Sequence, residues 1–144
     1  MRGTLVCAVT NGAESADALA LGAELSERLG LRLVLAHAVD GIGGGGDGGG
    51  ESVTMKADRE GAARLLDRLA AEHAVAGRAE RRVAVGDAAS LLGQIAAEEG
   101  ADLIVVGARS RGRLRRGLES RLADELESET PVPVLIAPPR LRQS

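Results

Sequence analysis

The sequence predicts an α/β protein built on an open parallel sheet with helices on both faces. Five short apolar segments, which are the expected strands, alternate with segments of helical periodicity along the 144 residues. The apolar run Leu103–Val106 is rich in β-branched residues and contains no polar one, which is typical of a strand buried on both faces. The length suits one domain, residues 1–144, with its own core.

The first strand and helix have clear boundaries. Leu5–Val9 predicts the strand, and turn-forming residues follow it at positions 10–12. The helix that follows ends at Gly30, a residue favoured where a helix stops, and Leu31–Val39 predicts the second strand. The residues expected on the buried face of this helix are Ala18, Leu21, Gly22, Leu25 and Leu29.

The middle of the chain opens with a glycine-rich segment. Gly41–Gly50 reads GIGGGGDGGG, and we expect a flexible insertion within the domain. A second helix follows, and Gly77 is expected to end it. Its apolar face consists of Ala62, Leu65, Leu66, Leu69 and Ala70, with His73 near the same stripe and expected to be partly buried.

The third strand and helix follow directly. Ala79–Val85 is more polar than the other strands and therefore suits an edge of the sheet. Asp87 is the expected N-cap of the third helix, and Gly100 closes that helix. The apolar face of the helix consists of Ala88, Leu91, Leu92, Ile95 and Ala96.

A basic loop follows the fourth strand. Gly107 ends that strand, and helical spacing resumes later and continues to about Glu129. The last expected strand, residues 132–137, carries Pro133, which cannot donate to a ladder and so favours an edge position. Ligands of open α/β sheets bind outside the carboxyl ends of the strands, so this loop is the first place to look for a site. Its five arginines are Arg109, Arg111, Arg113, Arg115 and Arg116.

The composition of the chain argues against several classes of function. The net charge of -3 favours neither nucleic acid nor an anionic membrane, and the chain has no Phe, Tyr or Trp on which a base could stack. The single cysteine, Cys7, lies in an apolar strand, which indicates a buried thiol and no disulfide. With no signal peptide or membrane-spanning segment in view, we expect a cytoplasmic protein.

Two catalytic motifs fit only in part. Gly107 and Gly112 have the spacing that opens a phosphate-binding P-loop, but Arg113 and Leu114 replace the Lys and Ser/Thr that must follow. Ser110 lies in a segment similar to a nucleophile elbow, without an evident acid–histidine pair to support it. We therefore expect neither a P-loop nor a hydrolase, and no spacing of ligand residues suggests zinc.

Taken together, the segments resemble the universal stress protein family over essentially the whole chain. The segment from Glu99 to Gly107, which follows Gly86-Asp87-Ala88, is the most family-like part. The other segments that carry the resemblance are Leu5–Gly12, Leu33–Val39 with His37-Ala38 near its end, and Pro131–Ile136. The resemblance implies a Rossmann-like, five-stranded parallel sheet in the order 3-2-1-4-5. It also implies a homodimer in which the edge strands at 132–137 of two subunits pair.

Many members of this family bind ATP through a pattern after the fourth strand: Gly-x-x-Gly, nine residues, then Gly-Ser/Thr. An acidic residue after the first strand assists. On this chain only Gly107 matches the pattern. The other positions fall on Ser110, Ser120, Arg121 and, for the acidic residue, Thr10 or Asn11.

Our interpretation is a dimeric stress-response or regulatory module with a degenerate ATP loop, no enzyme activity and no tightly bound cofactor. The alternative is a member that binds ATP or AMP, or hydrolyses ATP slowly, through a loop remodelled by arginine and serine. A guanidinium can hold a phosphate with two hydrogen bonds, which supports that alternative. It places Gly107, Arg109, Ser110 and Ser120 at the phosphates and Thr10 and Ala38 near the nucleoside, with Arg121 at the last position of the pattern.

Overall fold

The computed structural model describes residues 3–10, 12–39, 53–108 and 121–139, and of residues 53–57 only the backbone. Strands and helices alternate along the chain, as the sequence predicts. The glycine-rich segment 41–50 and the arginines at 109–116 lie outside the described residues. The elements are β1 (Thr4–Val9), α1 (Glu14–Leu29), β2 (Arg32–Val39), α2 (Val53–Glu72), β3 (Glu80–Val85), α3 (Ala88–Glu99), β4 (Leu103–Gly107), α4 (Leu122–Glu129) and β5 (Val134–Ala137).

The strands form one sheet in the order β3-β2-β1-β4-β5, and every neighbouring pair is parallel. This confirms the predicted fold class and strand order. In the centre, Cys7 of β1 is level with Leu35 of β2 on one side and with Val105 of β4 on the other. The polar strand β3 and the proline-flanked strand β5 are the two edges, also as predicted.

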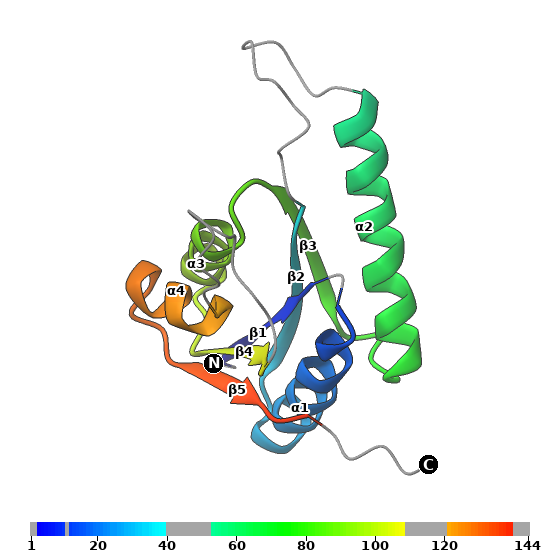
Figure 1. Cartoon of the computed structure of the whole chain (residues 1–144). Coiled ribbons are helices and arrows are strands. Elements are labelled where there is room, and N and C mark those ends of the chain that lie inside the picture. The colour runs from blue at the N-terminus through cyan, green and yellow to red at the C-terminus, as the bar shows by residue number, and fades with distance from the viewer. Residues whose placement is uncertain (1–2, 11, 40–52, 109–120, 140–144) are drawn as a thin grey trace.

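Each face of the sheet is covered by two helices (Figure 1). Alternate residues of the strands supply the two cores, since successive side chains point to opposite faces. Leu5, Cys7 and Leu35 pack with α1 and α2, whereas Val6 and Ile104 pack with α3 and α4. Leu, Ile, Val and Ala thus fill the core that a chain without aromatic residues has to build.

Most helix boundaries follow the predicted signals. Gly30 and Gly100 end their helices in the left-handed conformation, and the Asp87 carboxylate caps α3 by accepting a 3.1 Å hydrogen bond from the Ser90 backbone N–H. The prediction that Gly77 ends the second helix is wrong: α2 stops at Glu72. The left-handed residue beyond it is Ala74, with φ 57°, because the Val75 N–H turns back to the Ala70 carbonyl at 2.9 Å.

The buried face of α1 differs in part from the predicted one. Ala18 and Gly22 are buried as predicted, but Leu29 is 61% exposed. Leu19 and Ser26, which were not predicted, are buried. The hydroxyl of Ser26 accepts a 2.9 Å hydrogen bond from Arg78, which follows α2 and brings that side of α1 against the body of the molecule. The last strand begins at Val134 and not at residue 132, since a proline at 133 cannot continue the ladder.

Candidate functional site

The strand order places the topological switch point of the sheet between β1 and β4. From β1 the chain continues to β2 and β3 on one side, then crosses back to β4 on the other. In open α/β sheets this reversal leaves a ligand crevice at the carboxyl ends of the two central strands. Among the sequence-predicted residues, Thr10 directly follows β1 and Gly107 ends β4, so the fold brings these two to the switch point.

The side chain of Thr10 is held in the turn between β1 and α1. Its hydroxyl donates to Oε1 of Glu14 at 2.7 Å and accepts from the Gly12 N–H at 3.1 Å. The Ser15 hydroxyl closes the same turn, accepting from the Thr10 N–H at 2.6 Å and donating to the Thr10 carbonyl at 2.8 Å. The single proton of the Thr10 hydroxyl is therefore already used within the turn.

Glu14 is the residue of this site that the sequence analysis did not single out. It opens α1, is half-buried, and its carboxylate lies over Gly12, where any Cβ would clash with it. Its main chain contacts the end of β4. An acidic residue in the first turn after the first strand is a visible signal, but the family pattern directed attention only to positions 10 and 11.

Gly107 is in close contact with α1. A Cβ at this position would lie 2.6 Å from the Glu14 carbonyl oxygen and 2.8 Å from the Glu14 Cβ, both shorter than real Cβ contacts. Glycine is therefore required here for the first turn of α1 to pack against β4. Helix packing alone therefore explains the glycine at the one position that matches the ATP-binding pattern.

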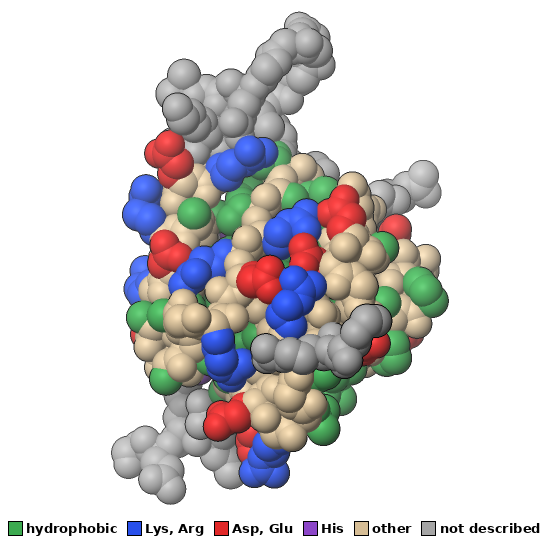
Figure 2. All heavy atoms as spheres, turned by 180° about the vertical axis from the view of Figure 1, so that it is seen from behind, with side chains coloured by type: hydrophobic (Ala, Val, Ile, Leu, Met, Phe, Trp, Pro, Cys, Tyr) green, Lys and Arg blue, Asp and Glu red, His purple; other side chains and the backbone are tan. Residues whose placement is uncertain are grey.

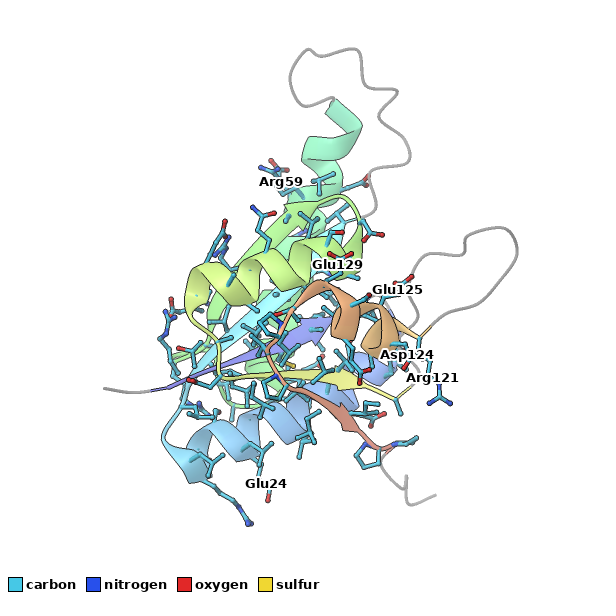
Figure 3. The ribbon with its side chains drawn as sticks, turned by 90° about the vertical axis from the view of Figure 1, so that its left-hand side faces the viewer. Glu24, Arg59, Arg121, Asp124, Glu125 and Glu129 are labelled. Atoms are coloured by element: carbon cyan, nitrogen blue, oxygen red, sulfur yellow. The ribbon has the colours of Figure 1, made fainter. Side chains whose placement is uncertain are left out.

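Ala38 and Arg121 also lie at this edge of the sheet. Ala38 is level with Ala84 of β3, and the register that pairs Val9 with His37 puts Thr10 level with Ala38. Arg121 immediately precedes α4 and points outward (Figure 3). The other predicted site residues, Arg109, Ser110 and Ser120, lie outside the described residues, as does Asn11.

Two chemically reactive side chains near this edge are buried. The His37 imidazole is 4% exposed, and its Nδ1 donates a 2.6 Å hydrogen bond to the Val9 carbonyl, which can only accept. Burial raises the pKa of the Cys7 thiol to about 12, so this cysteine is a neutral core residue, as expected from the sequence. Each of these two side chains has a structural role.

The described residues contain no group of three His, Cys, Asp or Glu side chains placed to hold a metal ion. None of their helices combines the length and the apolar character needed to cross a membrane.

Comparison with solved structures finds the same fold repeatedly. A protein of the universal stress protein family from Burkholderia pseudomallei is 28% identical, with 92% of this chain and 94% of that chain covered and a TM-score of 0.69. The universal stress protein from Archaeoglobus fulgidus in complex with dAMP is 19% identical, with 93% and 96% covered and a TM-score of 0.68. A universal stress protein in complex with cAMP is 18% identical, with 93% and 95% covered and a TM-score of 0.71.

A comparison with curated protein sequences gave no match. The model of the universal stress protein family, in contrast, matches residues 1–138, which is nearly the whole chain. The sequence resemblance is thus confirmed: this chain belongs to the universal stress protein family.

Proposed function

We propose that this protein is a stress-response or regulatory binding module that does not bind ATP tightly. The proposal depends on Gly107, the only position of the chain that matches the ATP-binding pattern. A glycine is needed there because any side chain would clash with the first turn of α1. Its presence therefore needs no nucleotide to explain it. The Thr10 hydroxyl is likewise taken up by Glu14 and Gly12 inside its turn.

The replaced positions weaken any phosphate site. Glycines let backbone N–H groups approach a phosphate closely, and Ser110 and Ser120 stand at two positions where the family pattern has glycine. Each lost hydrogen bond to a charged group costs roughly 1.5–3 kcal/mol, so three losses total at least about 4.5 kcal/mol. That is more than a thousandfold in affinity and turns a micromolar site into a millimolar one.

We also propose that the protein is a homodimer through β5. This edge strand pairs with β4 on one side, and its Leu135 and Ile136 side chains are 38% and 43% exposed. A free ladder with apolar side chains invites pairing with a second strand. The opposite edge, β3, carries Glu80, Arg81 and Arg82, which disfavour such pairing.

Restoring the family pattern tests the proposal. The triple variant Ser110→Gly, Ser120→Gly, Arg121→Ser recreates the pattern after Gly107. We expect calorimetry to show no tight ATP binding by the natural chain and at least tenfold tighter binding by the variant. The matched control is Arg116→Ser, which removes one positive charge from the same segment without supplying a glycine and is expected to bind no better than the natural chain.

Two results would contradict the proposal. One is micromolar or tighter ATP binding by the natural chain. The other is a stoichiometric adenine nucleotide released when the purified protein is denatured, which is easily seen because a chain without aromatic residues absorbs almost nothing near 260 nm.

Either result would favour the second candidate, a nucleotide-binding member with a remodelled loop. Relatives of the same fold hold dAMP and cAMP, which supports this candidate. If the arginines at 109 and 111 hold the phosphates in place of the missing backbone contacts, the double variant Arg109→Ala, Arg111→Ala abolishes the binding. Unchanged affinity would exclude this site.

A further inference from the structure

The edge strand β5 offers only a short ladder to a second copy. The Ala108 N–H donates to the Ala137 carbonyl at 3.0 Å, so the main chain of Ala137 faces β4. Successive residues of a strand direct their main-chain groups to alternate sides, which leaves those of Ile136 and Val134 on the outer side. Pro138, the next residue on that side, has no N–H to donate. Because an interface built on so few hydrogen bonds is weak, the charges around it can decide whether it forms.

The helix α4 lies beside this edge (Figure 1). It contacts β5, whereas α3 covers the strands on the other side of the same face. Gly93 of α3 lies against the main chain and the Cβ of Glu129, so this side of α4 faces α3. Residues two positions apart in a helix differ by about 200° in direction, so Glu127 is turned away from α3 and toward the outer edge of the sheet. Asp124, three positions before Glu127, lies on the same side.

This outer side of α4 carries acidic charge without a basic partner. Asp124 and Glu127 are exposed, and no ion pair among the described residues includes either of them. Near the opposite edge of the sheet, in contrast, Glu80 and Glu98 are both paired with arginine. The helix itself, Leu122–Glu129, contains no Lys or Arg. Its negative charge is therefore not neutralised within the described part of the chain.

Antiparallel pairing of two β5 strands brings two α4 helices together. The two-fold axis of such a pair stands perpendicular to the sheet, so both copies keep α4 on the same face. Paired strands lie about 4.8 Å apart and a helix is about 10 Å wide, so helices that cover the two paired strands become neighbours. Each helix then presents its outer, acidic side to the same side of its partner, and like charges repel.

We propose that Asp124 and Glu127 make the association of two copies through β5 dependent on salt. Their charges repel across the two-fold axis at low ionic strength, and dissolved ions relieve this repulsion as the ionic strength rises. The range of a charge falls from about 30 Å at 0.01 M salt to about 8 Å at 0.15 M, which is close to the width of a helix. The inference rests on the homodimer of the proposed function and adds its regulation.

The test measures the dissociation constant of the dimer at about 0.01 M and about 0.15 M sodium chloride. Sedimentation velocity with interference optics suits a chain without aromatic residues. The test variant is Asp124→Asn, Glu127→Gln, which removes both charges and keeps the size of the side chains. The matched control is Asp58→Asn, Glu60→Gln, which makes the same changes at exposed positions of α2, a helix that covers β2 and β3.

We expect the dissociation constant of the natural chain to fall roughly three- to tenfold as the salt concentration rises. The test variant should dimerise at low salt as tightly as the natural chain does at high salt, and salt should then change its affinity little. The control should keep the salt dependence of the natural chain. Overturning results would be a natural dimer that salt weakens or leaves unchanged, or a test variant that keeps the salt dependence.

Failure of the homodimer itself gives a different result. A chain and a test variant that are monomeric at both salt concentrations contradict the dimer and this inference together. Adding Ile136→Lys to the test variant should restore the monomer, and a dimer that persists would place the interface away from β5. A dimer that Ile136→Lys abolishes, but that responds neither to salt nor to the charges of α4, contradicts this inference alone.

Discussion

The contact between Gly107 and Glu14 is the residue-scale feature on which the candidate site depends. It joins the end of β4, where the family's ligand pattern begins, to the start of α1. A glycine that looks functional in the sequence is here required by the packing of a helix. Glu14 lies a few positions beyond Thr10 and Asn11, on which the acidic residue of the family pattern falls.

We predict that Gly107→Ala destabilises the protein by about 1–3 kcal/mol, since the new methyl group would overlap the Glu14 carbonyl and β4 and α1 would have to separate. Urea unfolding followed by far-ultraviolet circular dichroism measures this in a chain without tryptophan or tyrosine. Gly77→Ala is the control, because a Cβ there meets nothing within 4 Å and φ is not positive. Equal stability of the two variants would show that the contact imposes no strain.

At the scale of elements, an ion-pair network joins β2, β3 and α3 at the edge of the sheet where the strands begin. Glu99, at the end of α3, accepts from Arg32 at 2.8 Å and from Arg82 at 2.6 Å. Arg32 also bonds Glu80 at 2.8 Å, and Arg82 bonds Glu98 at 2.6 Å. On the face that Figure 2 shows, acidic and basic side chains are interleaved in the same manner. Salt-bridge networks of this kind stabilise more than isolated pairs.

The network predicts a loss of stability in acid. The hydrogen bond from Arg82, aided by Arg32 and opposed by partial desolvation, lowers the pKa of Glu99. A carboxyl group whose pKa is lowered by folding contributes stability above its unfolded pKa, about 4.3, and loses it as the pH falls through the folded pKa. We expect Glu99→Gln to cost roughly 1–2 kcal/mol at pH 7.

The difference between Glu99→Gln and the natural chain should shrink as the pH falls below about 4.3. Unfolding free energies measured at pH 7 and at lower pH check this. Glu24→Gln, which removes an exposed i,i+4 pair with Arg28, is expected to change the stability by no more than about 0.5 kcal/mol at either pH. A cost of Glu99→Gln that is independent of pH would contradict the role given to the network.

At the scale of the whole molecule, the two sheet edges differ in character. β3 is charged at its start and is joined to α3 through Arg82, whereas β5 exposes Leu135 and Ile136. Helices cover both faces of the sheet, so β5 is the edge of the sheet best suited to join two copies (Figure 1).

We predict that Ile136→Lys shifts the protein from dimer to monomer, because a lysine on an edge strand disfavours pairing with another strand. Light scattering on a sizing column gives the mass directly. The control is Leu29→Lys on α1, where the leucine is 61% exposed and belongs to no edge. A natural chain that is monomeric, or a variant that remains dimeric, would remove β5 as the interface.

The predictable part of the fold depended on local signals. Leu103–Val106 reads as a doubly buried strand because every side chain in it is apolar, and it is the core of β4. Gly30, Gly100 and Asp87 predicted helix ends correctly because each has a conformational or capping preference of its own. The end of α2 was misplaced because the chain puts Ala74, which has no such preference, in the left-handed position.

The strand order brings the carboxyl ends of β1 and β4 side by side, and Thr10 and Gly107 lie at these ends. That they belong to a ligand site stays a prediction. The contact between Gly107 and Glu14 was not predictable, because the two residues are 93 positions apart in the sequence. A contact of this kind depends on how a helix is seated on a sheet, which no local pattern specifies.

The sequence by itself therefore determined the alternation of elements, the polar and proline-marked edges, the family and the broken ATP pattern, because each depends on residue type and spacing along the chain. The tertiary structure alone decided which face of α1 is buried, why Gly107 is a glycine, and that Glu14 lies against the end of β4. The physical reason is that these features depend on close packing between segments far apart in sequence, where a few tenths of an ångström decide which atoms can be neighbours.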